Sequence, residues 1–210
     1  MNTQPIHRRL GMAALLVIAT VLALLAPSRA AFANLPPAGG DSTVAKAVAA
    51  LANKEYSNVD GHKFEKPIAT NCNYFTTATW HASGATNSGC SVSTWYKEEW
   101  CMDFSRWVYK TSNASVADLS HLAYSAKDYA TYQTVSSGRK PRVGDLAVWA
   151  NESHVGIVVA VSSSGVPTVV SGNSYNPAYP SGDDMHKYSA IWKSTYSVST
   201  FQGFAAPLHA

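Results

Sequence analysis

The chain has 210 residues, of which 46% are hydrophobic and 14% charged, so it has the composition of a folded domain and not of a disordered chain. Three cysteines are too few for a fold built mainly from disulfides. The formal charge of +3 is due to the three arginines of the first 33 residues, and the remainder has 13 basic and 13 acidic residues. This balance offers no basic stripe of the kind that binds nucleic acid, so we expect no nucleic-acid partner.

Residues 1–33 are typical of a secretory signal peptide. Two arginines precede the uncharged apolar run Met12–Ala26, and Ala31-Phe32-Ala33 fits a small-x-small cleavage site, although cleavage after Ala30 fits too. The run is shorter than a membrane-spanning helix, which needs about 20 apolar residues. The alternative is that the segment stays uncleaved as an N-terminal membrane anchor. We therefore expect a secreted protein without stable membrane association, in which disulfides can form.

The segment that follows begins with a Pro/Gly spacer, 34–40, and continues as a single globular domain over 41–210. Apolar residues at helical spacing predict a helix over Thr43–Leu51. Residues 71–94 are rich in Thr, Ser, Asn and Gly, which predicts an irregular excursion.

The rest of the chain changes from helical to strand patterns. Helical periodicity predicts a helix over Trp100–Lys110 and, more weakly, one over Val116–Tyr129. Runs rich in apolar and β-branched residues then predict strands. These strands are Asp145–Trp149, His154–Val161, Val166–Asn173, Ile191–Trp192 and Thr200–Phe204. Helices followed by antiparallel strands indicate an α+β fold.

Cys101 lies where a reactive thiol is expected. It is at the start of the predicted helix Trp100–Lys110, where unpaired backbone N–H groups and the helix dipole stabilise a thiolate. Such a setting is expected to lower the pKa of the cysteine and to make its sulfur a nucleophile. The alternative is a buried, inert cysteine, which is the common fate of a free cysteine.

The hairpin predicted from the strands His154–Val161 and Val166–Asn173 places His154 opposite Asn173. A four-residue turn over Ser162–Gly165 pairs Val161 with Val166, and the same register pairs His154 with Asn173. The Asn173 carbonyl could then accept the ring N–H of His154 and fix its tautomer, which is the orienting role in a Cys-His-Asn triad. The alternatives are a structural histidine at a strand end and an asparagine in a turn.

Together these residues resemble the CHAP family, the cysteine- and histidine-dependent amidohydrolases/peptidases. In chain order the matching motifs are Trp100-Cys101-x-x-Phe104 with Trp107-Val108, Pro141-x-x-Gly144-Asp145-Leu146, His154-Val155-Gly156-Ile157-Val158 and Gly172-Asn173. The resemblance covers about residues 90–205. The segment Asn71-Cys72-Asn73 followed by Cys90 is similar to actinobacterial secreted members.

The resemblance implies a papain-like α+β fold, related to the NlpC/P60 enzymes, and hydrolysis of amide bonds in peptidoglycan. The enzyme would be an N-acetylmuramoyl-L-alanine amidase or an endopeptidase. Cys101 would be the nucleophile and His154 the general base. The third role falls on Asn173, because Ser171 stands where family members commonly carry a glutamate or a comparable polar residue.

The resemblance places the catalytic region at residues 95–210, after an N-terminal region over 41–94. Cys72 and Cys90 can form a disulfide that leaves Cys101 free. The alternative pairing of Cys90 with Cys101 would abolish the activity. We expect a monomer that is extracellular or associated with the cell wall, with peptidoglycan as its partner.

Aromatic residues near the motifs are candidates for substrate binding, although such residues are as often part of a core. They are Trp95, Tyr96, Trp100, Trp149 and Tyr175. We expect no cofactor and no metal, since the chain has no C-x-x-C and no H-E-x-x-H motif. The stretch Ser91–Tyr96 also lacks the aspartates through which some family members bind calcium.

Two other functions remain open from the sequence. A non-catalytic protein that binds the cell wall would keep the fold and the aromatic residues without needing Cys101. An exported antibacterial toxin would use the same hydrolytic chemistry and the same residues.

Overall fold

The computed structural model describes residues 43–68, 70–76, 85–112, 133–134, 138–175 and 189–205. The chain separates into two units, Met1–Leu35 and Pro36–Ala210, and all described residues belong to the second. The predicted signal peptide, the spacer and the predicted helix Val116–Tyr129 lie outside the described residues. Within the described part, no helix is both long and apolar enough to cross a bilayer.

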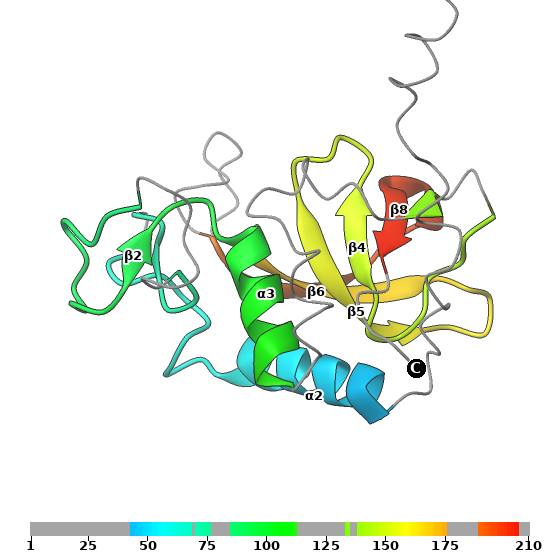
Figure 1. Cartoon of the computed structure of the whole chain (residues 1–210), viewed down its shortest axis with the longest axis horizontal. Helices are drawn as coiled ribbons and strands as arrows, with labels where there is room; N and C mark the ends of the chain where they lie inside the picture. The colour runs from blue at the N-terminus through cyan, green and yellow to red at the C-terminus, as the bar shows by residue number, and fades with distance from the viewer. Residues whose placement is uncertain are drawn as a thin grey trace, which may run out of the picture. The chain divides into compact units, whose positions relative to one another are not determined.

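The described residues form an α+β fold, as the sequence predicts. The helices are α2 (Thr43–Ser57) and α3 (Cys101–Thr111). The main sheet has the strand order β3-β8-β4-β5-β6-β7, and its neighbouring strands are antiparallel. Its strands are β3 (Gln133–Thr134), β4 (Leu146–Trp149), β5 (Val155–Val161), β6 (Pro167–Ser174), β7 (Ala190–Thr195) and β8 (Phe201–Ala205). Both helices pack against β5 and β6 (Figure 1).

Helix α2 continues six residues beyond the predicted end at Leu51. The buried face of the helix continues beyond Leu51, through Ala52 to Glu55. Glu55 is 3% exposed, and its carboxylate is hydrogen-bonded by the Asn58 amide at 3.2 Å and by the His62 ring at 3.1 Å. These partners allow an acidic side chain to occupy the inward face of the helix.

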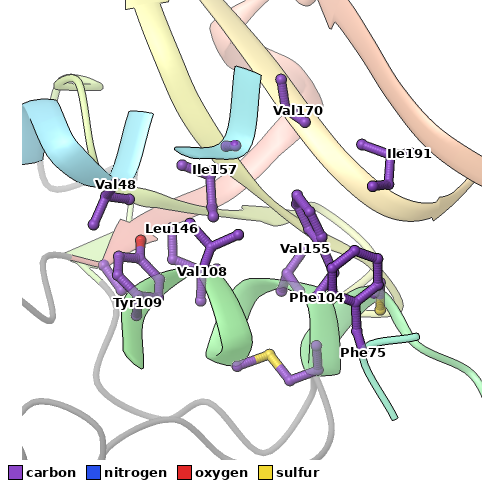
Figure 2. Packing of buried hydrophobic residues seen from close by; sticks show 14 of the residues in the cluster. Val48, Phe75, Phe104, Val108, Tyr109, Leu146, Val155, Ile157, Val170 and Ile191 are labelled. Atoms are coloured by element: carbon purple, nitrogen blue, oxygen red, sulfur yellow. The ribbon is translucent and has the colours of Figure 1, made fainter. Parts of the chain in front are cut away.

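Buried apolar side chains lie on both faces of the main sheet. Successive residues of β4 alternate between the two clusters: Leu146 and Val148 face the helices, and Ala147 faces the other way. Figure 2 shows the helix-side cluster, with side chains from α2, α3 and the sheet interdigitating. The cluster on the other face contains Ala147, Val158, Val169, Phe201 and Phe204.

The hairpin of β5 and β6 differs from the predicted one at its tip. Val161 pairs with Pro167 and not with Val166, because the loop is one residue longer than expected. An irregularity at Val159 then shifts the register, so that Ile157 pairs with Val170 as predicted. The predicted register is therefore wrong at the turn and correct toward the site.

A two-stranded sheet of β1 (Cys72–Asn73) and β2 (Tyr96–Lys97) carries the predicted disulfide. Cys72 and Cys90 are bonded, and Cys101 is free. The alternative pairing of Cys90 with Cys101 is thus excluded.

The buried carboxylate of Glu65 joins this small sheet to the main domain. Glu65 is 1% exposed and accepts hydrogen bonds from the backbone N–H groups of Thr70 at 3.0 Å and Asn71 at 2.9 Å. Its other oxygen accepts the indole N–H of Trp100 at 3.1 Å and the hydroxyl of Ser189. Three separate segments therefore meet at one side chain, and burial raises its pKa.

Candidate active site

Cys101 is the first residue of α3, as the sequence predicts. The preceding residue, Trp100, is fully buried, and its carbonyl accepts the N–H of Phe104 at 3.0 Å in the first turn. The thiol belongs to a residue that is only 7% exposed. The packing of Trp100 thus places the sulfur at the end of the helix where backbone N–H groups point outward.

The structure does not give this thiol the lowered pKa expected of a helix N-terminus. Burial raises the pKa of Cys101 from 9.0 to about 11, and the negative charges of Glu99 and Asp103 act in the same direction. Hydrogen bonding from the backbone N–H groups of Val155 and Met102 lowers the pKa, but by less. Desolvation therefore outweighs the helix terminus, so the buried setting favours the protonated thiol.

His154 immediately precedes β5, and its ring packs edge-on against Trp149 with ring centroids 4.7 Å apart. Its carbonyl accepts the backbone N–H of Trp149 at 3.0 Å, which fixes the start of the strand. Burial lowers the pKa of His154 to about 4, so the imidazole is neutral at physiological pH and can accept a proton. The N–H of the next residue, Val155, faces the Cys101 sulfur, which brings the two predicted catalytic residues to the same end of β5.

Asn173 reaches the same region from β6. Its φ of 49° lies in the left-handed region, at the point where the pairing of β6 with β7 shifts register. Its amide nitrogen donates to the Glu99 carboxylate at 2.6 Å. Its carbonyl oxygen Oδ1 is buried and has no hydrogen-bond partner within the described residues. The expected hydrogen bond from His154 to this oxygen is therefore not formed in this structure.

Gly172 allows β6 to pass close to the first turn of α3. A Cβ at this position would lie 2.6 Å from Phe104 Cβ and 2.7 Å from the Trp100 ring. Real side chains do not tolerate such contacts, so glycine is required for the strand to pass the first turn of the helix. Gly172 therefore sets the separation between Asn173 and the residues around Cys101.

A comparison with known families agrees with this arrangement. The family model of the CHAP domain matches residues 91–173, a segment that contains Cys101 and His154 and ends at Asn173. This segment is a CHAP domain. No curated protein and no solved structure gave a match. The CHAP domain has a papain-like α+β fold and supports an amidase or peptidase function of the peptidoglycan-hydrolase type, with peptidoglycan as the implied substrate.

The aromatic candidates occupy different positions around the CHAP domain. Trp100 is fully buried and Trp95 is 5% exposed, so both rings belong to the interior. Trp149 packs against the cluster on the sheet face away from the helices. Tyr96 is half-buried in β2, and Tyr175, just after β6, is 42% exposed. Tyr175 is therefore the most exposed of the five rings, and Trp149 is the one that contacts His154.

Two acidic groups of the CHAP domain were not predicted as part of the site. One is Glu99, whose contact with Asn173 joins residues 74 positions apart. The other is Asp103, 2% exposed, whose carboxyl accepts the Thr76 hydroxyl at 2.5 Å and is hydrogen-bonded to Glu98. Burial raises the pKa of Asp103 to about 8. The only signal in the sequence was the pair of glutamates, Glu98 and Glu99, just before Trp100-Cys101. This pair does not reveal that Glu99 contacts Asn173 or that Glu98 contacts Asp103.

Two further residues of the CHAP domain have structural roles. Ser171 is 1% exposed and pairs with Trp192 in the β6–β7 ladder. Asp145 accepts two hydrogen bonds from Arg139, at 2.9 and 2.8 Å, and one from the backbone N–H of Arg142 at 2.8 Å. Asp145 thus braces the loop before β4. Across the described residues no group of three His, Cys, Asp or Glu side chains is arranged to hold a metal ion.

Proposed function

We propose that this protein is an exported hydrolase that cleaves amide bonds of peptidoglycan through a thioester on Cys101. The observation that carries the proposal is the position of the one free cysteine among the described residues. It begins α3, inside a matched CHAP domain, and its sulfur faces the backbone N–H of the residue that follows His154. The disulfide between Cys72 and Cys90 and the signal-peptide pattern of residues 1–33 support export.

The two perturbed pKa values define how the reaction would begin. A thiol with a pKa of about 11 and an imidazole with a pKa of about 4 favour a neutral pair over a thiolate–imidazolium pair. His154 would therefore take the thiol proton as the sulfur attacks the scissile carbonyl, and not before. Backbone N–H groups at the start of α3, that of Cys101 among them, would stabilise the oxyanion.

The same groups would complete the cycle. The imidazolium of His154 would give its proton to the leaving amine, which leaves an acyl group on Cys101. His154 would then activate water to hydrolyse the thioester and restore the thiol. Asn173 would hold the imidazole in the tautomer that accepts the thiol proton. Tyr96, which is half-buried, and Tyr175, which is exposed two residues after Asn173, would contact the glycan or the stem peptide.

The test is cleavage of peptidoglycan by the purified protein and by its Cys101→Ala variant. Walls of several chemotypes are digested with and without EDTA, and soluble products are identified by mass spectrometry. We expect fragments from the wild type in both conditions and none from the variant. A new lactyl carboxyl group would identify an amidase, and a new peptide terminus an endopeptidase.

Two results would contradict the proposal. Cleavage that persists in Cys101→Ala would exclude the thioester. A wild type that binds every wall but cleaves none would instead support a non-catalytic wall-binding protein.

A further inference from the structure

Glu99 is an acidic side chain beside the nucleophile that the proposed reaction has not yet used. It is exposed and lies two residues before Cys101, and its negative charge raises the pKa of the Cys101 thiol. Its Oε2 accepts the hydrogen bond from Asn173 Nδ2 at 2.6 Å. A charged acceptor makes such a bond short and strong relative to a neutral pair.

This contact determines which way the Asn173 amide points. A carboxylate only accepts hydrogen bonds, so it selects the NH2 end of the amide and repels the carbonyl end. The carbonyl oxygen Oδ1 is then directed away from Glu99, into a buried position without a hydrogen-bond partner among the described residues. A buried acceptor without a partner is unfavourable, so this oxygen is available to a hydrogen-bond donor that reaches it.

The strand register indicates which donor is nearest along the sheet. Ile157 pairs with Val170, and the same register continued toward the site places residue 173 opposite His154. The left-handed φ of Asn173 turns this residue out of the regular ladder, and Gly172 brings it close to α3. Asn173 therefore contacts Glu99 from the end of β6 that runs antiparallel to the start of β5.

We propose that Glu99 is a positioning residue, which holds the Asn173 amide so that Oδ1 accepts the ring N–H of His154 in solution, a hydrogen bond that this structure does not contain. This role rests on the proposed function, because it concerns the general base of that reaction. Ser171 is buried in the β6–β7 ladder and has no carboxylate. The carboxylate that contacts Asn173 comes instead from Glu99, in the segment before α3.

The kinetic test compares Glu99→Leu, Glu99→Gln, Asn173→Ala and the double variant Glu99→Leu/Asn173→Ala. Glu99→Leu should lower kcat about tenfold, the change that corresponds to one hydrogen bond of about 1.4 kcal/mol, with KM nearly unchanged. Glu99→Gln should retain most of kcat, because its carbonyl can still accept from Asn173. In the Asn173→Ala background, Glu99→Leu should cause no further loss. Asp60→Ala, which removes an exposed carboxylate from the turn after α2, is the charge control.

A spectroscopic readout decides the proposal without reference to activity. The ring nitrogens of His154 in ¹⁵N-labelled full-length protein should report one dominant neutral tautomer in the wild type and in Glu99→Gln, and a mixture in Glu99→Leu. An unchanged tautomer in a folded Glu99→Leu protein would overturn the proposal. So would a loss of kcat that Glu99→Gln fails to rescue, or one that persists in the Asn173→Ala background.

Failure of the proposed function would look different. In that case the wild type would cleave no wall, or Cys101→Ala would cleave as well as the wild type, whereas the tautomer measurement would still report on Glu99.

Discussion

Asp103→Asn should change how the stability of the protein depends on pH. The carboxyl of Asp103 is 2% exposed, and burial raises its pKa from 3.8 to about 8, against the smaller opposing effects of the Thr76 hydroxyl and Arg106. The folded state therefore keeps a proton that the unfolded state loses above about pH 4. Since the folded state binds more protons, the free energy of unfolding falls as pH rises through this range, by up to about 1.4 kcal/mol per pH unit.

Asparagine imitates the protonated carboxyl at this position. Its NH2 group can donate to Glu98, and its carbonyl can accept the Thr76 hydroxyl that now lies 2.5 Å from Asp103. The variant should thus match the stability of the wild type below about pH 4, where the aspartic acid is protonated in both the folded and the unfolded state. Above that pH its stability should exceed that of the wild type by a margin that grows by up to about 1.4 kcal/mol per pH unit, because the folded wild type keeps a buried proton that its unfolded state has lost.

Urea denaturation followed by tryptophan fluorescence at pH 5, 6, 7 and 8 measures this difference. Asp145, whose pKa burial raises to about 7, contributes to the same pH range, but it is present in both proteins and cancels in the comparison. The reasoning would be refuted by a difference between the two proteins that stays constant from pH 5 to pH 8. It would also be refuted by a variant that loses stability relative to the wild type as pH rises.

Three other outcomes are expected. The rate of alkylation of Cys101 by iodoacetamide should still increase with pH up to about 10. At pH 7 this rate should be at least about tenfold lower than for a thiol of ordinary pKa. A rate that is constant from about pH 5 upward would instead indicate a preformed thiolate. Because His154 must be neutral to accept the thiol proton, kcat/KM measured on soluble wall fragments should fall as pH drops through about 4, and an acid limb near pH 6.5 would contradict the burial of the ring. Glu65→Gln should lower the free energy of unfolding, measured by urea titration, by about 1–3 kcal/mol, because the NH2 group of the glutamine must face either Trp100 or a backbone N–H donor. An unchanged urea midpoint would show that the four hydrogen bonds to Glu65 are dispensable.

Local patterns were sufficient to predict most of the fold. The helix that begins at Cys101 and the five predicted strands were found within a few residues of their bounds, because apolar periodicity reports directly on the buried face. The early end assigned to α2 at Leu51 was wrong because Glu55 lies on its inward face. Only the fold provides Asn58 and His62 as partners for that carboxylate.

The position of Cys101 at the start of α3 was predictable from the sequence, but the electrostatics around its sulfur were not. Position at a helix N-terminus predicts a lowered pKa for Cys101, but the outcome depends on how completely tertiary packing desolvates the sulfur. The contact of Glu99 with Asn173 likewise depends on a close approach between β6 and α3. A pattern along the chain cannot contain a pairing across 74 residues.

The β-bulge at Val159 lies between the loop of the β5–β6 hairpin and the end of the hairpin next to His154. The loop 162–166 is mostly exposed, and a side chain added at Gly165 would meet nothing within 4 Å. Because the bulge lies between this loop and His154, one extra residue near the tip is absorbed before it reaches the end of the strands next to His154. Insertions and deletions at this tip should therefore be tolerated during evolution, and a reporter peptide could be grafted there without changing which residues meet at Cys101.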